Sequence, residues 1–219
     1  MISQDLVNRI LTSLVLLPVL FYFSFNSGIY LIIFLSLIYF LSFYEIIKNT
    51  KNLLFIFLSN LILILAFFSF YYLRGNSNSS LIILYWVLAS TFLSDIGGYV
   101  VGRIIKGKKL TKISPNKTYS GAVGSIIFSF FALPFLNILQ NYFFGQLLVN
   151  LLQFNYILLT ILISIICQLG DLYISYWKRK IKIKDISNIL PGHGGILDRI
   201  DGLIFVLIFS FILNIVGAI

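Results

Sequence analysis

The chain is poor in the residues that build disulfides and zinc centres in soluble proteins. Its 219 residues include one cysteine, one histidine, one methionine and four prolines. The single cysteine rules out an internal disulfide, and the single histidine argues against a zinc cage. Charged residues make up only 11% of the chain and hydrophobic residues 59%, which excludes an ordinary soluble domain.

Long apolar runs fill most of the sequence. A bilayer core about 30 Å thick needs about 20 apolar residues in a helix that rises about 1.5 Å per residue. We expect spanning helices at about 10–25, 28–44, 53–73, 81–101, 121–137, 147–177 and 199–219. The sixth run is longer than one perpendicular helix needs, so it is either a tilted helix that projects beyond the membrane or a helix preceded by a re-entrant piece. The sequence thus predicts an all-α, polytopic integral membrane bundle of about seven transmembrane helices.

Basic residues are distributed unevenly between the two ends of these helices. The chain has 16 lysines and arginines against 7 acidic residues, a net charge of +9. With a cytoplasmic N-terminus and about seven crossings, every basic residue except Arg74 falls on the cytoplasmic side. Cationic loops resist translocation, so this asymmetry supports that orientation. Topology and contact with anionic lipid account for the net charge, and no motif indicates nucleic-acid binding.

The few acidic residues fall into two groups. Three lie in or beside polar loops, where we expect them to be solvated: Asp5, Glu45 and Asp185. The other four lie within or at the ends of apolar runs: Asp95, Asp171, Asp198 and Asp201. An aspartate at the centre of a spanning helix costs roughly 2.5 to 3.5 kcal/mol, so each of these needs a partner or a function.

The four intramembrane aspartates are expected at one depth. Asp95 and Asp171 each precede a basic border by seven or eight residues, which puts them about 10 to 12 Å below it. Asp198 and Asp201 are three residues apart, so they share a helix face at the start of the last run. The sequence therefore predicts an acidic pocket, open to the cytoplasm, that suits Mg²⁺ or Mn²⁺ and leaves room for a second cation.

A structural alternative for these aspartates is that they lock helices together through ion pairs. The neighbouring cations that could serve are Arg103, Lys178 and Arg199. There are more carboxylates than these cations need as ion-pair partners. Clustered carboxylates also repel one another unless a proton or a metal ion lies between them. The pattern therefore favours a site over simple locking.

Two polar loops flank the acidic cluster. The loop 102–121 carries six basic residues together with Ser114 and Thr118, a set suited to holding phosphate oxygens. The loop after residue 177 ends in a turn whose Gly192, Gly194 and Gly195 let backbone N–H groups approach a ligand. A plain tight turn at the membrane interface would explain these glycines, but it would not explain the adjacent Asp198 and Asp201 equally well. Carboxylates for a cation beside cations for phosphate indicate phosphoryl or nucleotidyl transfer at a membrane surface.

Residues 168–203, "QLGDLYISYWKRKIKIKDISNILPGHGGILDRIDGL", closely resemble the C-terminal signature of the phosphatidate cytidylyltransferases. Upstream, "SDIGGYVVGR" and "SPNKTYSG" are similar to two further blocks of that family. The sequence departs from the pattern at Ser120, where the family usually has glutamate, and at Gly202, where serine is common. The resemblance covers roughly the C-terminal half, whereas the first three helices match only in being hydrophobic.

The resemblance implies that CTP and phosphatidate react to give CDP-diacylglycerol and pyrophosphate, with Mg²⁺ required. The metal ligands it implies are Asp171, Asp198 and Asp201. These three, with Lys178 and Arg179, form the implied catalytic set. The implied substrate-binding residues are Ser175, Lys117, Thr118, Ser114, Gly192, His193, Gly194, Gly195, Arg199, Arg103 and Asp95.

The organisation that follows is a single membrane domain over 1–219. Residues 1–80 supply N-terminal hydrophobic helices, and 81–219 supply the catalytic helices and cytoplasmic loops. We expect an integral protein of the bacterial cytoplasmic (inner) membrane, with its active site facing the cytoplasm. Its expected partners are CTP, phosphatidate and membrane lipid. Whether it forms a homodimer stays open. Two alternatives are a CTP-dependent polyprenol or dolichol kinase, which would release CDP, and a transporter that uses the aspartates as an ion path.

Overall fold

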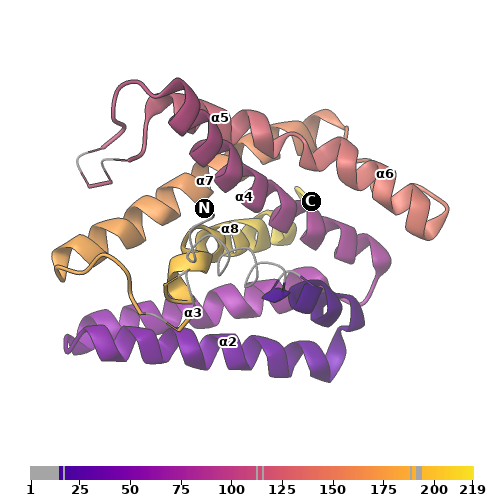
Figure 1. Cartoon of the computed structure of the whole chain (residues 1–219). Helices are drawn as coiled ribbons and strands as arrows, with labels where there is room; N and C mark the ends of the chain where they lie inside the picture. The colour runs from indigo at the N-terminus through magenta and orange to yellow at the C-terminus, as the bar shows by residue number, and fades with distance from the viewer. Residues whose placement is uncertain (1–14, 17, 112, 115, 188, 191–193) are drawn as a thin grey trace.

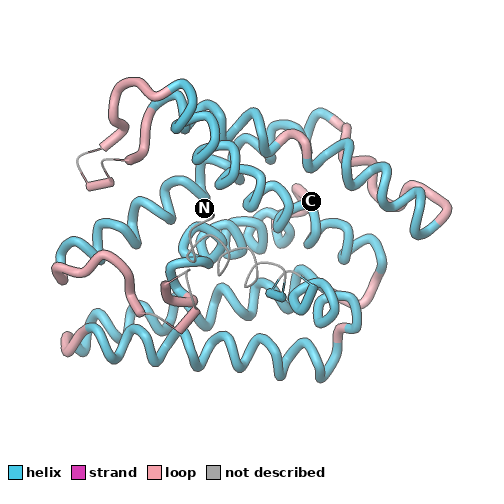
Figure 2. The backbone as a smooth tube through the Cα atoms, viewed as in Figure 1, coloured by secondary structure: helices cyan, strands magenta, loops and turns pink. Residues whose placement is uncertain are grey.

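The computed structural model describes residues 15–16, 18–111, 113–114, 116–187, 189–190 and 194–219. Its named elements are all helices: α2 (Gly28–Asn49), α3 (Leu53–Arg74), α4 (Asn78–Ile105), α5 (Tyr119–Ser129), α6 (Ala132–Phe144), α7 (Phe154–Lys180) and α8 (Leu197–Ile215). Within the described residues the only strand-like pairings are two isolated bridges, and Figure 2 shows helices joined by short loops. The predicted all-α fold is confirmed.

Several helices begin where a polar side chain satisfies the free N–H groups of the first turn. The Asn52 side chain accepts from the Phe55 N–H at 3.1 Å at the start of α3. Ser77 and Ser80 form a reciprocal capping box at the start of α4. Thr118 accepts from the Gly121 N–H at 3.1 Å at the start of α5. These caps fix helix starts in a chain whose apolar runs do not mark their own ends.

A proline separates α5 from α6. Pro134 has no N–H, and its ring would clash with the carbonyl four residues earlier, which is that of Phe130. The backbone responds with tighter bonds, from Phe131 N–H to Phe128 O at 3.0 Å and from Leu133 N–H to Phe130 O at 3.1 Å. The expected single helix at 121–137 is therefore two consecutive helices, and together they cover 119–144.

Within the described residues, five helical segments are long and apolar enough to cross a membrane, judged by length and composition: α2, α3, α4, residues 119–144 and α7. The expected last span forms α8, which opens with Asp198, Arg199 and Asp201. Of the expected first span, 10–25, residues 15–16 and 18–25 are described and helical, and the others lie outside the described residues. The count of about seven and the N-terminal orientation therefore stay predictions.

The expected run 147–177 becomes a turn region followed by a long helix. Residues 147–153 are not helical, and α7 begins at Phe154. Its 27 residues extend about 40 Å, more than the bilayer core, which favours the tilted, projecting helix over the re-entrant piece.

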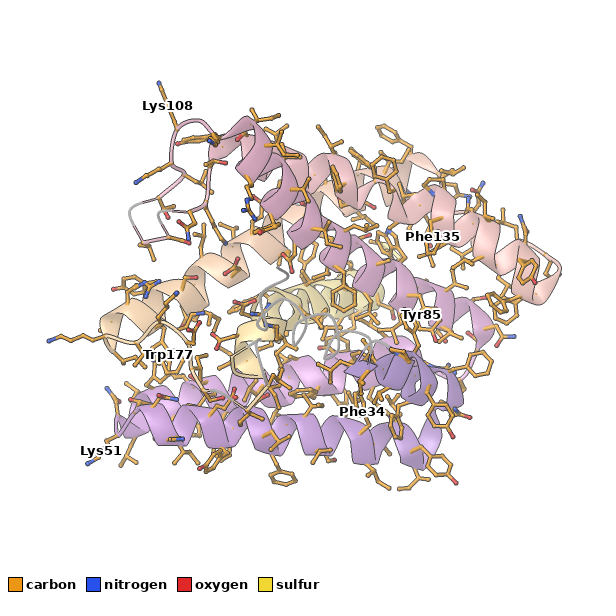
Figure 3. All side chains as sticks on the ribbon, viewed as in Figure 1. Phe34, Lys51, Tyr85, Lys108, Phe135 and Trp177 are labelled. Atoms are coloured by element: carbon orange, nitrogen blue, oxygen red, sulfur yellow. The ribbon has the colours of Figure 1, made fainter. Side chains whose placement is uncertain are left out.

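The helices pack with α7 and α8 between two groups. Figure 1 shows α2 and α3 side by side at the bottom, α5 and α6 at the top, α4 crossing from the right side to the upper left, and α8 in the middle. The α2–α3 turn, the α4–α5 loop and the C-terminal end of α7 lie at the left-hand end. Lys51 and Lys108, labelled in Figure 3, both lie at that end, so basic segments far apart in sequence share one end of the bundle.

Glycines let α4 and α5 cross in backbone contact. A Cβ built on Gly97 would lie 2.5 Å from the Gly124 carbonyl oxygen, and one on Gly121 would lie 2.8 Å from the Gly98 oxygen. Only small residues permit such an approach. This contact holds the loop before α5 beside α4.

An apolar cluster joins four helices near the basic end of the bundle. Its buried members include Ile46 of α2, Leu63 of α3, Trp177 of α7 and Leu197 of α8. Phe55 stacks on Trp177 with ring centroids 4.8 Å apart. Trp177, labelled in Figure 3, is the residue before Lys178, so this packing fixes the end of α7 that carries the candidate site.

Candidate active site

A partly buried ion pair connects α7 to the start of α8. The Lys178 Nζ lies 2.7 Å from Asp198 Oδ1, and the two side chains are 12% and 5% exposed. The second oxygen of Asp198 accepts backbone N–H groups from Ile186 at 2.8 Å and Gly195 at 3.0 Å. Asp198 thus ties together α7, α8 and the loop between them.

A second ion pair connects the α4–α5 loop to α7. The Lys117 Nζ lies 2.5 Å from Asp171 Oδ2, with side chains 24% and 30% exposed. Ser175, one turn later on α7, donates to Asp171 Oδ1 at 3.3 Å. The Lys117 N–H donates to Ser114 O at 3.0 Å, and Thr118 caps α5, so the loop geometry delivers Lys117 to the carboxylate.

Asp95 and Asp201 complete the acidic group. Asp201 interacts electrostatically with Asp171, Lys178 and Asp95, and its Oδ1 accepts the Gly202 N–H at 2.9 Å. Asp95 lies ten residues from the end of α4, and it accepts a hydrogen bond from the buried Cys167 thiol at 3.3 Å. Carboxylates from α4, α7 and α8 therefore adjoin one region of the bundle.

The carboxylates do not form a preassembled metal cage. Across the described part of the chain, no group of three or more His, Cys, Asp or Glu side chains is arranged to hold a metal ion. Both oxygens of Asp198 already accept hydrogen bonds. Mg²⁺ is commonly held by one or two carboxylates together with substrate phosphates and water. Asp171 of α7 and Asp201 of α8 interact electrostatically, and this pair fits a Mg²⁺ site with two protein carboxylates.

The three arginines of the expected site have different interaction partners. The exposed Arg103 donates to Tyr99 Oη at 2.7 Å, and its guanidinium lies 5.9 Å from the Tyr99 ring centre. The exposed Arg179, in the last turn of α7, donates to Ile183 O in the following loop at 3.2 Å. Arg199 interacts electrostatically with Asp95. Of these three arginines, Arg199 is therefore the one that interacts with the acidic group among the described residues.

The glycine turn is described only in part. Gly192 and His193 lie outside the described residues, so the structure says nothing of their predicted role. Gly194 has a φ of +85°, which favours glycine, and it exchanges two backbone hydrogen bonds with Leu190, at 2.9 and 3.1 Å. The Gly195 N–H donates to Asp198. The N–H groups of Gly194 and Gly195 thus donate to oxygens of the chain itself.

The expectation that Glu45 is a solvated loop charge was wrong. Helix α2 continues to Asn49, and Glu45 is fully buried in it. Its carboxylate accepts the backbone N–H groups of Ile196 and Leu197, each at 2.9 Å, and the Ser187 hydroxyl at 2.5 Å. A signal was available: Ser42, Glu45 and Asn49 are three and four residues apart and form a polar stripe on an apolar helix.

The two departures from the family pattern both sit in packed surroundings. Ser120 donates to the Lys106 carbonyl and shares a 2.9 Å hydrogen bond with Thr118, so it braces the basic loop. A Cβ on Gly202 would lie 2.7 Å from Cys167 Sγ and 2.9 Å from the Cys167 carbonyl oxygen. Glycine at 202 therefore allows α8 to pack closely on α7 at the level of Asp201.

The chain is similar in sequence to known proteins over most of its length. The model of the cytidylyltransferase family matches residues 47–216. Phosphatidate cytidylyltransferase of Bacillus subtilis is 37% identical over 180 residues, covering 79% of this chain and 63% of the relative. The enzyme of that name from Rickettsia conorii is 34% identical over 146 residues, covering 64% and 60%, and that from Staphylococcus saprophyticus is 38% identical over 139 residues, covering 63% and 51%.

The chain spans between half and two thirds of the length of these relatives. The matched region contains α3 to α8 and both ion pairs of the site. Because the family model matches well over half of the chain, the chain belongs to the cytidylyltransferase family.

Proposed function

We propose that this protein transfers the cytidylyl group of CTP to phosphatidate, forming CDP-diacylglycerol and releasing pyrophosphate. The names of the similar bacterial proteins support the substrate class. The observation that carries the proposal is the meeting of two ion pairs from separate segments, Lys117 with Asp171 and Lys178 with Asp198, beside Asp95 and Asp201. Such mixed charge suits a polyphosphate and its cation.

In the proposed reaction, a phosphate oxygen of phosphatidate attacks the α-phosphorus of CTP. A P–O bond forms there, the bond from the α-phosphorus to the bridging oxygen breaks, and pyrophosphate leaves with the electron pair. A phosphate nucleophile is already ionised near neutral pH, so the chain needs to supply position and charge more than a general base.

Lys117 and Lys178 are suited to bind the CTP phosphates. Each ammonium is held by a carboxylate in the free chain, at 2.5 and 2.7 Å. A phosphate can take over part of either contact without moving the lysine far, because each lysine has three donors. Ser175, which donates to Asp171, adds a hydroxyl on the same face of α7.

We assign Mg²⁺ to Asp171 and Asp201, with Mn²⁺ as a substitute and with Asp198 as a further ligand on the family pattern. Bound there, the cation would neutralise charge on the reacting phosphates. The chain's own contribution is to keep these carboxylates on adjoining helices and accessible from the basic end of the bundle.

We propose that the basic end of the bundle faces the cytoplasm of a bacterial cell and that the protein resides in the cytoplasmic membrane. The support is the gathering of the α2–α3 turn, the α4–α5 loop and the end of α7 at one end. The apolar helix surfaces would keep phosphatidate acyl chains in the bilayer while its headgroup enters the site. A homodimer stays a prediction, which the mass of the detergent-solubilised protein tests.

The deciding experiment supplies purified, folded protein with CTP, Mg²⁺ and phosphatidate in detergent micelles. The proposal expects CDP-diacylglycerol and pyrophosphate in equal amounts. Release of CDP with a phosphorylated lipid would indicate a lipid kinase instead, and solute flux without CTP turnover in vesicles would indicate a transporter. Inactivity of a folded sample towards phosphatidate would remove the proposed function.

A further inference from the structure

Glu45 is a buried carboxylate that the proposed chemistry does not use. It lies on α2, two residues upstream of the region matched by the family model, and it is 0% exposed. Burial of a carboxylate is costly unless hydrogen bonds compensate it. Three donors do so here, all from the segment that leads into α8: Ile196 N–H, Leu197 N–H and the Ser187 hydroxyl.

These contacts replace a missing helix cap. The cap residue of α8 is Ile196, whose side chain cannot accept a hydrogen bond. The free N–H groups of a first turn need acceptors, and a negative charge is favourable at a helix N-terminus. Glu45 supplies both from another helix. Asn49, one turn further along α2, also binds the loop by donating to Ile186 O at 2.8 Å.

Glu45 and Asp198 accept hydrogen bonds from different backbone N–H groups of the segment 186–197. Glu45 takes the N–H groups of Ile196 and Leu197, while Asp198 takes those of Ile186 and Gly195. The two carboxylates approach closely at Gly195, where a Cβ would lie 2.8 Å from Glu45 Oε1 and 3.1 Å from Asp198 Oδ2. The position of Asp198 is therefore set through the same few residues that Glu45 holds.

We propose that Glu45 is a positioning residue for the transfer reaction: it fixes the first turn of α8 and thereby the direction in which Asp198 and Asp201 face α7. This inference rests on the proposed function. Misplacing a reacting group by about 1 Å can cost on the order of 100-fold in rate, so loss of this anchor should lower kcat far more than it weakens substrate binding.

The test compares Glu45→Gln with Gln140→Leu. A glutamine at 45 keeps one oxygen and turns an NH₂ group towards backbone donors, so it cannot satisfy both N–H groups. Gln140 of α6 is a matched control, because it is also fully buried and accepts two loop N–H groups, from Leu148 and Val149 at 3.0 Å each. It serves the loop after α6, away from the α7–α8 ion pair.

Two measurements are made on each variant below its unfolding temperature. Hydrogen–deuterium exchange of a peptide covering 194–203 should accelerate in Glu45→Gln and stay at the native rate in Gln140→Leu. The kcat for CDP-diacylglycerol formation should fall on the order of 100-fold in Glu45→Gln with a smaller change in KM, and stay native in Gln140→Leu. Native exchange in Glu45→Gln, or faster exchange with native kcat, overturns the proposal.

A milder variant covers the case in which Glu45→Gln does not fold. Ser187→Ala removes one donor to Glu45 and leaves the carboxylate in place, so it should give a smaller change of the same kind in both measurements. Native kcat in Ser187→Ala would then overturn the proposal. If the unmodified protein makes no CDP-diacylglycerol, the proposed function fails, while the exchange measurement still reports whether Glu45 holds α8.

Discussion

Lys178 on α7 and Asp198 on α8 form a short contact, 2.7 Å from Nζ to Oδ1, in surroundings where neither side chain is more than 12% exposed. A buried pair of this kind is strongly coupled, because removing one partner leaves the other charge without compensation. The contact therefore links the stability of the helix pair to the integrity of the candidate site.

We expect Lys178→Met to abolish turnover and to lower the free energy of unfolding by about 3 to 5 kcal/mol, because Asp198 would remain buried without its cation. The double variant Lys178→Met/Asp198→Asn should recover part of that stability and no activity. Thermal unfolding in detergent and pyrophosphate release measure the two effects. Equal stability of Lys178→Met and the unmodified protein would show that the pair is not coupled as described.

Lys117→Ala should separate activity from stability. Its pair with Asp171 is about a quarter exposed on each side, so the loss of stability should stay below about 1 kcal/mol. Turnover should fall on the order of 100-fold if Lys117 neutralises a reacting phosphate. Lys108→Ala, in the same loop but pointing outward in Figure 3, is the control and should retain activity. Similar activity of the two variants would remove Lys117 from the site.

Gly97→Ala tests the crossing of α4 and α5. The added methyl group would meet the Gly124 carbonyl oxygen and the Phe128 side chain, each at 2.5 Å, so the helices must move apart at a cost of about 1 to 3 kcal/mol. Val123→Ala, on the exposed face of α5, should change the unfolding temperature much less. If Gly97→Ala unfolds at the native temperature, the helices are not in backbone contact.

Arg74→Ala should lower the stability of the fold and leave the catalytic rate unchanged. The buried guanidinium donates to the carbonyl oxygens of Ser24, Phe25 and Gly75 at the opposite end of α3 from the α2–α3 turn. Leaving buried acceptors unpaired costs about 1 to 3 kcal/mol. We expect a lower unfolding temperature with native kcat at a temperature where the variant is folded. A large fall in kcat would link that end of the bundle to the reaction.

Cysteine labelling tests the orientation. Lys108→Cys and Asn76→Cys place an exposed thiol in the α4–α5 loop and in the α3–α4 turn, and the native Cys167 is buried. A membrane-impermeant maleimide should label Asn76→Cys in intact cells and Lys108→Cys only after the membrane is permeabilised. The reverse pattern would place the candidate site on the outer side.

The local part of the site was predictable because helix periodicity fixes which residues share a face. The spacing of Asp171, Ser175 and Lys178, and that of Asp198 and Asp201, requires only that α7 and α8 be helices. The partner of Asp171 was not predictable, since Lys117 comes from a loop whose path depends on the glycine contact of α4 with α5.

The structural role of Glu45 was missed for a related reason. An acidic residue a few positions before a basic loop usually lies in water, and only the return of a distant segment buries it. The break at Phe130 and Phe131, by contrast, could have been read from Pro134 alone.

The hydrogen bonds from Ile196 and Leu197 to Glu45 join residues 151 and 152 positions apart. During synthesis, α2 enters the membrane long before the segment that will satisfy its buried carboxylate exists. The contact can form only after the chain has been made as far as α8, so this non-local pairing is a late step of assembly. A chain that stops before Ser187 would leave this carboxylate without its three donors among apolar helices, so the step that buries Glu45 also completes the segment that carries Asp198.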